Sequence, residues 1–559
     1  MATRRYLVTG ALPYSNGRLH VGHIAGAYLP ADIFVRYHRA RGDEAAFICG
    51  SDDNGVPITL TARKEGKTPA EVSKFYHDCQ VRDFEGLGIH FDIYGATTLP
   101  LHAEISQHFF LACLENGYLA KKETEQLYDR EAGMFLPDRY VKGRCPFCGH
   151  TEAYGDQCEG CGKTMNPKEL LEPKSVVSGS TPEIRRTVHW FFQLERFNKR
   201  LRDWHETHPE WRPMVRNFTG GLLRQGLPER AITRDLDWGI PVPVDDEDAK
   251  GKVLYVWFDA PIGYVSFTAQ WCQDQGGDRR DYEKWWKDPA TKIVHFIGED
   301  NVVFHAIMWP AMLLAEGTFE LPENIIANCF LNMRVGGKEE EKISKSRGTA
   351  IWIEEYLKEL EPDALRYYLT AIAPESQRTA FSLEDYVSRT NDELVAALGN
   401  FVHRTTTFTR RYFEGRVPEA HERSEAERAQ LATLAELHRT VTEKLEANSF
   451  RDALAEIMAA ARTCNRYFDT KAPWQQRKQD IAACGTTINV CLQSVRTLAT
   501  VFAPFLPFAA EKARAMFDLS AEDFAWDRAC EELAAGRPIG EPQMLFRKLD
   551  SAAALGPQG

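Results

Sequence analysis

The first 55 residues alternate between short apolar runs and one amphipathic stretch. Residues 5–10 are β-branched and aromatic, which predicts a strand. Residues 23–41 have helical periodicity that ends at Gly42, and Pro30 is expected to kink this helix. Residues 45–49 predict a second buried strand. A strand, a helix and a strand in this order predict a parallel βαβ unit.

The pattern then changes several times along the 559 residues. Helical patterns cover 68–86 and 101–116, and the alternation breaks after them. Apolar runs at 253–258 and 293–297 predict strands, and 303–316 predicts a long apolar helix. Residues 391–535 are helical almost throughout, which predicts a helix bundle. The fold class is therefore α/β, a Rossmann-type parallel sheet interrupted by an insertion and followed by an all-α bundle.

This pattern divides the chain into six segments. We expect two halves of one Rossmann-type domain, 1–116 and 231–330, with an insertion between them at 117–230. A linking segment (331–390), the helix bundle (391–535) and a C-terminal tail (536–559) follow.

Composition narrows the class of protein. The net charge of −12 argues against binding nucleic acid by bulk attraction, so an RNA partner would need a local basic face or base-specific contacts. No apolar run reaches the ~18 residues of a membrane span, and the N-terminus lacks the apolar core of a secretion signal. We therefore expect a cytoplasmic protein that does not bind membranes.

Two short motifs have the chemistry of a phosphate site. His20, Gly22 and His23 lie between the first predicted strand and its helix, where anions bind in open α/β sheets. Two imidazoles three residues apart share one face of a helical turn, and Gly22 would let a flat base approach the backbone. Taken alone, such a pair is more often two surface histidines.

The second motif is Lys342-Ile343-Ser344-Lys345-Ser346, in a glycine-rich and charged stretch. Lysines in a loop can neutralise a pyrophosphate leaving group, because phosphoryl chemistry depends mainly on positioning and electrostatic stabilisation. A lysine–serine pentapeptide alone is usually a solvated loop.

Together, the two motifs resemble the signatures of class I aminoacyl-tRNA synthetases. The wider context is similar to the methionyl-tRNA synthetases in particular, at residues 11–17 (ALPYSNG), 133–139 (GMFLPDR), 172–179 (EPKSVVSG) and 255–264 (YVWFDAPIGY). The resemblance covers residues 5 to about 550. It implies a ligase that activates L-methionine with ATP and Mg²⁺ to methionyl-adenylate and pyrophosphate. The methionyl group then passes to the 3′-terminal adenosine of tRNA(Met).

The resemblance also implies a role for individual residues. Trp257 and Tyr264 bracket small residues after a predicted strand, and by spacing alone would more often be plain core. The implied methionine contacts are Ala11, Leu12, Tyr14, Asp52, Trp257, Ala260, Pro261, Tyr264 and His305, with Asp52 on the ammonium group. The implied ATP contacts are His20, Gly22, His23, Asp300 and Lys345, and the catalytic set is His20, His23, Arg234, Lys342 and Lys345. Asn400, Arg404 and Trp474 would read the anticodon from the helix bundle.

Four of the 13 cysteines form two Cys-x-x-Cys pairs in the insertion: Cys145, Cys148, Cys158 and Cys161. This spacing predicts one tetrahedral Zn²⁺ per chain, with free thiols or disulfides as the weaker alternative. Four protein ligands leave no open position, so the zinc would be structural. His150 is an alternative fourth ligand.

Two other functions compete with this interpretation. A cysteine-specific class I synthetase would hold zinc in its amino-acid pocket with ligands spread along the chain. A non-catalytic RNA-binding relative would have lost His20, His23 or Lys345. An apolar pocket discriminates a one-methylene difference only by about 10–200-fold. We therefore expect rejection of homocysteine within the synthetic site, because the insertion is too short for a large editing domain. The end of the chain soon after Lys548 favours a monomer.

Overall fold

A five-stranded parallel sheet organises the N-terminal part of this computed structural model, which describes residues 3–155, 158, 160–161, 165–334, 341–342 and 350–549. Strand β1 lies in the middle and pairs on both sides, with Arg5 opposite both Glu44 and Thr291. The strands, in spatial order, are β14 (Asn324–Asn328), β13 (Thr291–Gly298), β1 (Arg5–Gly10), β2 (Glu44–Ser51) and β3 (Ile93–Ala96).

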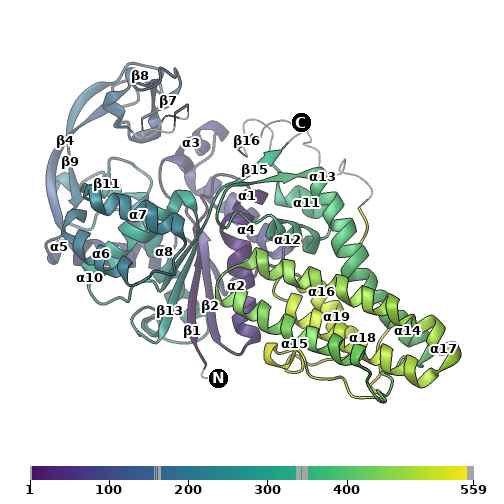
Figure 1. Ribbon diagram of the computed structural model, residues 1–559. Helices are drawn as coiled ribbons and strands as arrows, with labels where there is room; N and C mark the ends of the chain where they lie inside the picture. The colour runs from purple at the N-terminus through teal and green to yellow at the C-terminus, as the bar shows by residue number, and fades with distance from the viewer. Residues whose placement is uncertain are drawn as a thin grey trace.

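Helices cover both faces of this sheet (Figure 1). Tyr6 and Val8 pack into one buried cluster and Leu7 into another, so alternate residues of β1 enter two different cores. The helices are α1 (Val21–His23), η1 (Ile24–Tyr28), α2 (Leu29–Ala40), α3 (Val56–Glu65), α4 (Pro69–Gly86), α5 (Pro100–Glu115), α8 (Val256–Asp274), α9 (Glu283–Trp286), η8 (Phe304–Met308) and α10 (Trp309–Glu316). The predicted α/β class is confirmed.

Two details differ from the expectations. The predicted helix 23–41 contains a π-helical turn, η1, which ends two residues before Pro30. The predicted strand 253–258 is wrong beyond its first residues, because β12 is only Val253–Leu254 and α8 begins at Val256. A short apolar run cannot distinguish a buried strand from a buried helix. Trp257, Ala260, Pro261 and Tyr264 therefore lie on a helix.

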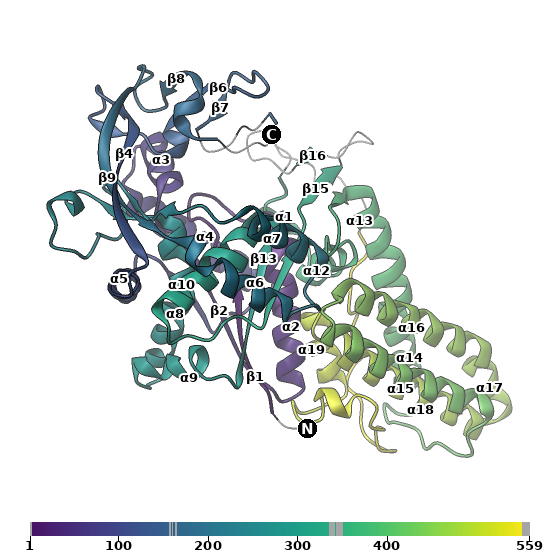
Figure 2. The same cartoon turned by 60° about the vertical axis from the view of Figure 1, so that its left-hand side comes forward.

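The insertion is an arm that rises from the sheet (Figures 1 and 2). Its two long strands pair antiparallel from Leu119 opposite Phe192 to Tyr128 opposite Glu183. A small three-stranded sheet lies at its tip, and two helices return to the sheet. The elements are β4 (Leu119–Asp129), β5 (Met134–Phe135), β6 (Val141–Arg144), β7 (Ala153–Tyr154), β8 (Leu171–Ser175), β9 (Glu183–Phe192), α6 (Asn198–Glu206), α7 (Pro213–Gln225), β10 (Arg230–Ala231) and β11 (Thr233–Arg234).

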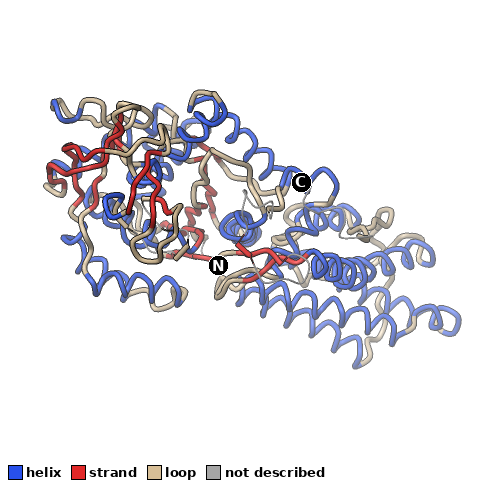
Figure 3. The backbone as a smooth tube through the Cα atoms, turned by 90° about the horizontal axis from the view of Figure 1, so that it is seen from above, coloured by secondary structure: helices blue, strands red, loops and turns tan. Residues whose placement is uncertain are grey.

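A linking segment and then a helix bundle complete the chain, and helices fill the end of the molecule opposite the arm (Figure 3). The linking elements are β15 (Leu331–Arg334), β16 (Glu341–Lys342), α11 (Ile353–Glu359), α12 (Pro362–Ala371), β17 (Thr379–Ser382) and α13 (Leu383–Arg389). The bundle elements are η9 (Thr390–Gly399), α14 (Asn400–Tyr412), α15 (Glu425–Glu446), α16 (Phe450–Lys471), α17 (Pro473–Gln479), α18 (Ile481–Phe502) and α19 (Pro507–Met516).

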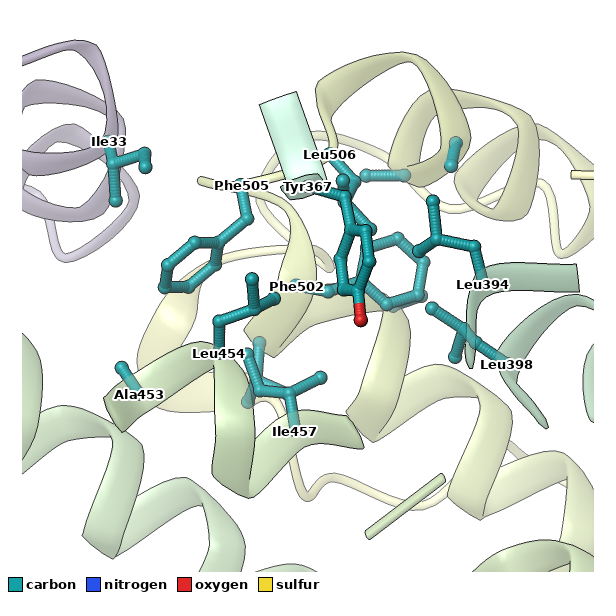
Figure 4. Close-up of a cluster of buried hydrophobic side chains, with 14 of the residues drawn as sticks. Ile33, Tyr367, Leu394, Leu398, Ala453, Leu454, Ile457, Phe502, Phe505 and Leu506 are labelled. Atoms are coloured by element: carbon teal, nitrogen blue, oxygen red, sulfur yellow. The ribbon is translucent and has the colours of Figure 1, made fainter. Parts of the chain in front are cut away.

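The bundle and the catalytic sheet share one hydrophobic core. Ile33 of α2, Tyr367 of α12 and Ile457 of α16 belong to the same buried cluster (Figure 4). Because this apolar surface is continuous, the bundle is held against the sheet by the same effect that folds each part. Among the described helices, none combines the length and apolar character that crossing a bilayer requires.

Candidate active site

The two histidines of the first motif lie together at the carboxyl end of the sheet. Gly22 N–H donates to Nδ1 of His20 at 3.1 Å, and His20 N–H donates to Nδ1 of His23 at 3.1 Å. The rings stack with centroids 3.7 Å apart. Because each Nδ1 accepts a hydrogen bond, the proton of each neutral ring lies on Nε2. Two adjacent Nε2–H groups at a helix start suit a phosphate.

A cavity of about 360 Å³ opens beside these rings. It joins residues predicted for ATP with residues predicted for methionine. Its walls include Ala11, Leu12, Tyr14, His20, Gly22, His23, Trp257 and Asp300. Five other predicted methionine contacts are buried but do not line the cavity: Asp52, Ala260, Pro261, Tyr264 and His305.

Aromatic rings form another part of the cavity wall. Trp257 stacks on Phe304 with centroids 3.7 Å apart and planes within 7°, and its ring meets Tyr14 edge-on at 6.3 Å. Leu12 packs beside Gly263, because a Cβ added to Gly263 would lie 3.1 Å from Cδ2 of Leu12. The result is an apolar wall between β1 and α8 that fits an unbranched apolar side chain.

Behind this wall, Tyr264 and His305 satisfy each other. Nδ1 of His305 lies 3.1 Å from the Asn301 carbonyl and therefore carries the ring proton. Nε2 then accepts from the Tyr264 hydroxyl at 2.8 Å. Burial lowers the pKa of His305 to about 4, so the ring is neutral at physiological pH. The pair provides shape without a charge.

Asp52 is a buried carboxyl group at the end of β2. Burial raises its pKa well above the ordinary value, and the neighbouring carboxylates of Asp259 and Asp53 raise it further. The Asn54 N–H donates to one of its oxygens at 3.3 Å. The backbone of Asp52 bridges that of Tyr14 at the cavity wall. An ammonium group placed here would relieve the repulsion between these acids.

The two acidic residues after β13, Glu299 and Asp300, make different contacts. Asp300 lines the cavity, and its Oδ1 lies close to Gly298, where an added Cβ would be 2.7 Å away. Glu299 instead forms an ion pair with Arg378 at 2.6 Å. Only Asp300 of this pair is therefore placed to contact a ligand in the cavity.

Of the remaining predicted catalytic groups, only the Arg234 side chain is described, and it does not line the cavity. The Arg234 guanidinium lies 3.8 Å from the ring centre of Tyr255, two residues before Trp257, and donates to the Ala231 and Thr233 carbonyls. Lys342 is described only as a backbone position in β16, paired with Asn332. Lys345 lies outside the described residues.

The four predicted zinc ligands meet at the tip of the arm. Their Sγ atoms all lie within 4.8 Å of one another, with Cys145–Cys161 at 3.9 Å and Cys148–Cys158 at 3.6 Å. Zinc–sulfur bonds of about 2.3 Å in a tetrahedron place sulfurs about 3.8 Å apart, whereas a disulfide needs about 2.05 Å. These distances fit a tetrahedral metal site and exclude disulfides between these pairs. His150 is not among the grouped ligands.

The predicted anticodon residues form one surface of the bundle. Arg404 lies over Phe468 at 4.4 Å and forms an ion pair with Asp469 at 2.6 Å. Phe468 is 6.1 Å from Trp474, whose side chain is 42 % exposed. Ala472 adopts a left-handed backbone with φ 42° at the turn between α16 and α17, and Trp474 follows two residues later, near Phe468 of α16. Asn400 is exposed one helical turn before Arg404.

Two residues near the site escaped the sequence reasoning. Phe304 belongs to an apolar stretch that predicts only a buried helix, and its stacking on Trp257 joins positions far apart in the chain. Gln80 lines the cavity and donates to the Tyr14 and Gly17 carbonyls at 3.0 and 3.3 Å. Neither position carries a local motif.

Comparisons with known proteins agree with this geometry. A family model described as tRNA synthetases class I (M) matches residues 6–406, and one described as the anticodon binding domain of methionyl tRNA ligase matches 417–555. A methionine–tRNA ligase of Parabacteroides distasonis is 48 % identical over 98 % of this chain and 79 % of its own. One of Thermococcus kodakarensis is 47 % identical over 98 % and 74 %.

A solved structure also matches. It is Mycobacterium tuberculosis methionyl-tRNA synthetase in complex with methionyl-adenylate, with a TM-score of 0.80 and 26 % identity over 97 % of this chain and 100 % of the other.

Proposed function

The chain belongs to the methionyl-tRNA synthetase family of class I, and we propose that the cavity at the carboxyl edge of its sheet is where methionine and ATP react. The enzyme is a methionine–tRNA ligase, as the sequence motifs predict. The observation that carries the site assignment is that one cavity contains both the stacked His20 and His23 rings and the aromatic wall around Trp257.

The chain's own side chains divide the first step between them. Asp52 binds the methionine ammonium, and the thioether side chain packs on Trp257 and Tyr14, with Tyr264 and His305 behind them. The remaining wall residues Ala11, Leu12, Ala260 and Pro261 shape the pocket. A carboxylate oxygen of methionine attacks the α-phosphorus of the Mg²⁺–ATP substrate, so that an O–Pα bond forms while the bond from Pα to the bridging oxygen breaks and pyrophosphate leaves.

Charge development on the phosphates is met at the other end of the cavity. Nε2–H groups of His20 and His23 donate to phosphate oxygens, which stabilises the transition state without any covalent enzyme intermediate. Asp300 binds the ribose, and Gly22 admits the base. Lys342 and Lys345 neutralise pyrophosphate, and Arg234 supports the site through Tyr255.

The second step uses the helix bundle. Asn400, Arg404 and Trp474 form a polar and aromatic surface that suits unstacked bases of the tRNA(Met) anticodon. The 2′-hydroxyl of the terminal adenosine then takes the methionyl group from the adenylate. The six segments predicted from the sequence correspond, in this proposal, to two catalytic halves, a zinc-bearing insertion, a lysine-loop linker, an anticodon bundle and a tail.

One zinc ion per chain would be held by Cys145, Cys148, Cys158 and Cys161, away from the cavity. A closed four-sulfur site supplies folding energy to the arm and no open position for a substrate. Elemental analysis of the purified protein tests this proposal, with one zinc per chain as the expected result. We also propose, from the sequence alone, that the protein is a cytoplasmic monomer.

The decisive experiment is exchange of labelled pyrophosphate into ATP with each of the twenty standard amino acids and no tRNA. Exchange with methionine alone is the expected result. Exchange with another amino acid would overturn the pocket assignment around Trp257. Absence of exchange in the folded protein would favour the non-catalytic relative.

The cysteine-specific alternative has no support in the geometry. The group of four cysteines at the tip of the arm is the one metal-ligand cluster among the described residues. It lies outside the cavity walls.

A further inference from the structure

The π-helical turn in the first catalytic helix creates a backbone problem beside His23. The Leu29 N–H donates to the Ile24 carbonyl, five residues back. The next residue, Pro30, has no N–H to donate. The Ala25 carbonyl therefore loses both donors that a helix would normally supply, and a buried carbonyl without a donor costs free energy.

Asn328 supplies the missing donor. It is the last residue of β14, at the carboxyl edge of the sheet, and it is fully buried. Its Nδ2 donates to the Ala25 carbonyl at 3.0 Å across 303 residues of sequence. This bond joins the sheet to the π turn, only two residues after His23.

Arg212 fixes the orientation of that amide. One of its guanidinium nitrogens donates to the Asn328 side-chain oxygen and, at 3.0 Å, to the Ala327 carbonyl. With its oxygen held by Arg212, the Asn328 amide can present only Nδ2 to Ala25. Burial lowers the pKa of Arg212, and the nearby carboxylate of Glu375 opposes that shift. The positive charge of the buried guanidinium therefore has a negative partner.

The same arginine also contacts the helix bundle. Its other terminal nitrogen donates to the Asn448 carbonyl at 3.0 Å. Asn448 has a left-handed backbone, φ 56°, in the turn between α15 and α16. One guanidinium from the insertion therefore joins the edge of the catalytic sheet to a turn of the anticodon bundle.

We propose that Asn328 and Arg212 are positioning residues that hold the π turn, and through it His20 and His23, in the geometry that the adenylation transition state requires. This inference rests on the proposed function of the two histidines. It adds a physical link from the insertion and the bundle to the phosphate end of the cavity. The link acts on the reaction step, because His20 and His23 are assigned to phosphate charge and not to methionine.

The test compares two isosteric substitutions of the same kind. Asn328→Asp keeps the oxygen that Arg212 binds and removes the donor to Ala25. Asn198→Asp is the matched control, because Asn198 is also buried, accepts from Arg202 at 2.9 Å and donates to the Leu223 carbonyl at 3.0 Å, but lies in α6. Arg212→Lys, with Arg202→Lys as its control, is the second route, since one ammonium cannot reproduce a planar fork.

The readout is methionine-dependent pyrophosphate exchange by the full chain, with tRNA binding and thermal unfolding measured alongside. We expect Asn328→Asp and Arg212→Lys to lower kcat about tenfold or more, because small misplacements of catalytic groups are costly. The KM for methionine and the Kd for tRNA should stay within about twofold, and both controls should keep kcat near the parent value.

Equal kcat values in each variant and its control would overturn the proposal, even if all of them lower the unfolding temperature. A rise in the KM for methionine at unchanged kcat would also overturn it. Absence of exchange in the parent chain would instead refute the proposed function itself, so the two failures are distinguishable.

Discussion

Two helices of the catalytic domain are built on the same plan and serve different chemistry. The helix after β1 and the helix after β13 each contain a five-residue π-helical segment, η1 and η8. In each, a proline follows as the second residue of the next α-helix, Pro30 of α2 and Pro310 of α10. The neighbouring strands β1 and β13 thus lead into similar backbone arrangements.

The difference lies in where the histidines sit on that backbone. His20 and His23 occupy the start of the first helix and line the cavity. His305 lies within the second π segment, buried and bonded to Tyr264. In the proposed function, the first helix therefore offers two polar donors to phosphate, whereas the second offers a neutral wall to the amino acid. The same helix geometry serves either purpose, and side-chain placement alone selects which.

Residues of the insertion also contribute to the hydrogen bonds around both π segments. His205 of α6 contacts the Ala306 carbonyl at 2.9 Å, and Pro310 has no N–H to reach that carbonyl from within the helix. In the first helix, Arg212 supports a contact from Asn328 to Ala25, which lies one position earlier in its π segment than Ala306 does in the second. The insertion thus supports both halves of the catalytic domain in addition to carrying the cysteine cluster.

The largest expected effect comes from truncating one histidine in each of the two helices. His23→Ala should lower kcat of exchange by about 10²–10³-fold, since it removes a donor to the transition state. His305→Ala should instead raise the KM for methionine with a much smaller change in kcat, because it opens the pocket wall. Steady-state exchange kinetics with varied methionine measure both, and similar kcat losses in the two variants would erase the proposed distinction.

The next largest effect concerns Asp52. Asp52→Asn should raise the KM for methionine by about 100-fold or more, because a buried ammonium would lose its partner. The pKa of Asp52 is raised by burial and by Asp259, so its carboxyl binds protons more tightly in the folded state than in the unfolded state. Stability from this group is present at low pH and is lost as pH rises through the raised pKa.

Ligand-free Asp52→Asn protein should therefore be at least as stable as the parent at neutral pH. In the parent, kcat/KM for methionine should fall as pH drops through the raised pKa, and this acid limb should be missing from the variant. A pH series of exchange kinetics with thermal unfolding at neutral pH checks both points. An identical acid limb in both proteins would assign it to another group.

A smaller effect is expected for Tyr264→Phe, which tests the hydrogen bond between Tyr264 and His305 of the second helix. Loss of the hydroxyl leaves Nε2 of His305 buried without its donor, at a cost of about 1–3 kcal/mol. The KM for methionine should rise about tenfold with kcat little changed. Phe267→Leu, a core change on the same helix, is the control, and an equal rise in KM there would point to packing of α8 instead.

The smallest effect on exchange is expected outside both helices. Trp474→Ala should leave exchange near the parent rate and lower kcat/KM for tRNA about tenfold, as loss of one base stack would. Phe508→Ala, another exposed aromatic in the bundle, is the control. Aminoacylation with varied tRNA measures the effect. Equal losses in the two variants would remove Trp474 from the proposed anticodon surface.

Local pattern was sufficient for much of this molecule. The helix boundaries 68–86 and 101–116 predicted from periodicity differ from α4 and α5 by at most one residue at each end. The spacing of His20 and His23 predicted that their rings share a face, and the cysteine spacing predicted one cluster, since both depend on residues close in sequence. The apolar run at 253–258 failed because a buried helix and a buried strand have the same composition.

The sequence by itself determined the family, the α/β fold followed by a bundle, and the residue types available for phosphate, methionine and metal. Only the tertiary structure decided that Phe304 stacks on Trp257, that Tyr264 neutralises the polarity of His305, and that Asn328 reaches Ala25. These contacts join residues tens to hundreds of positions apart, and no periodic signal encodes them. Each exists because burial leaves a ring face or a polar atom in need of a partner, and packing decides which neighbour supplies it.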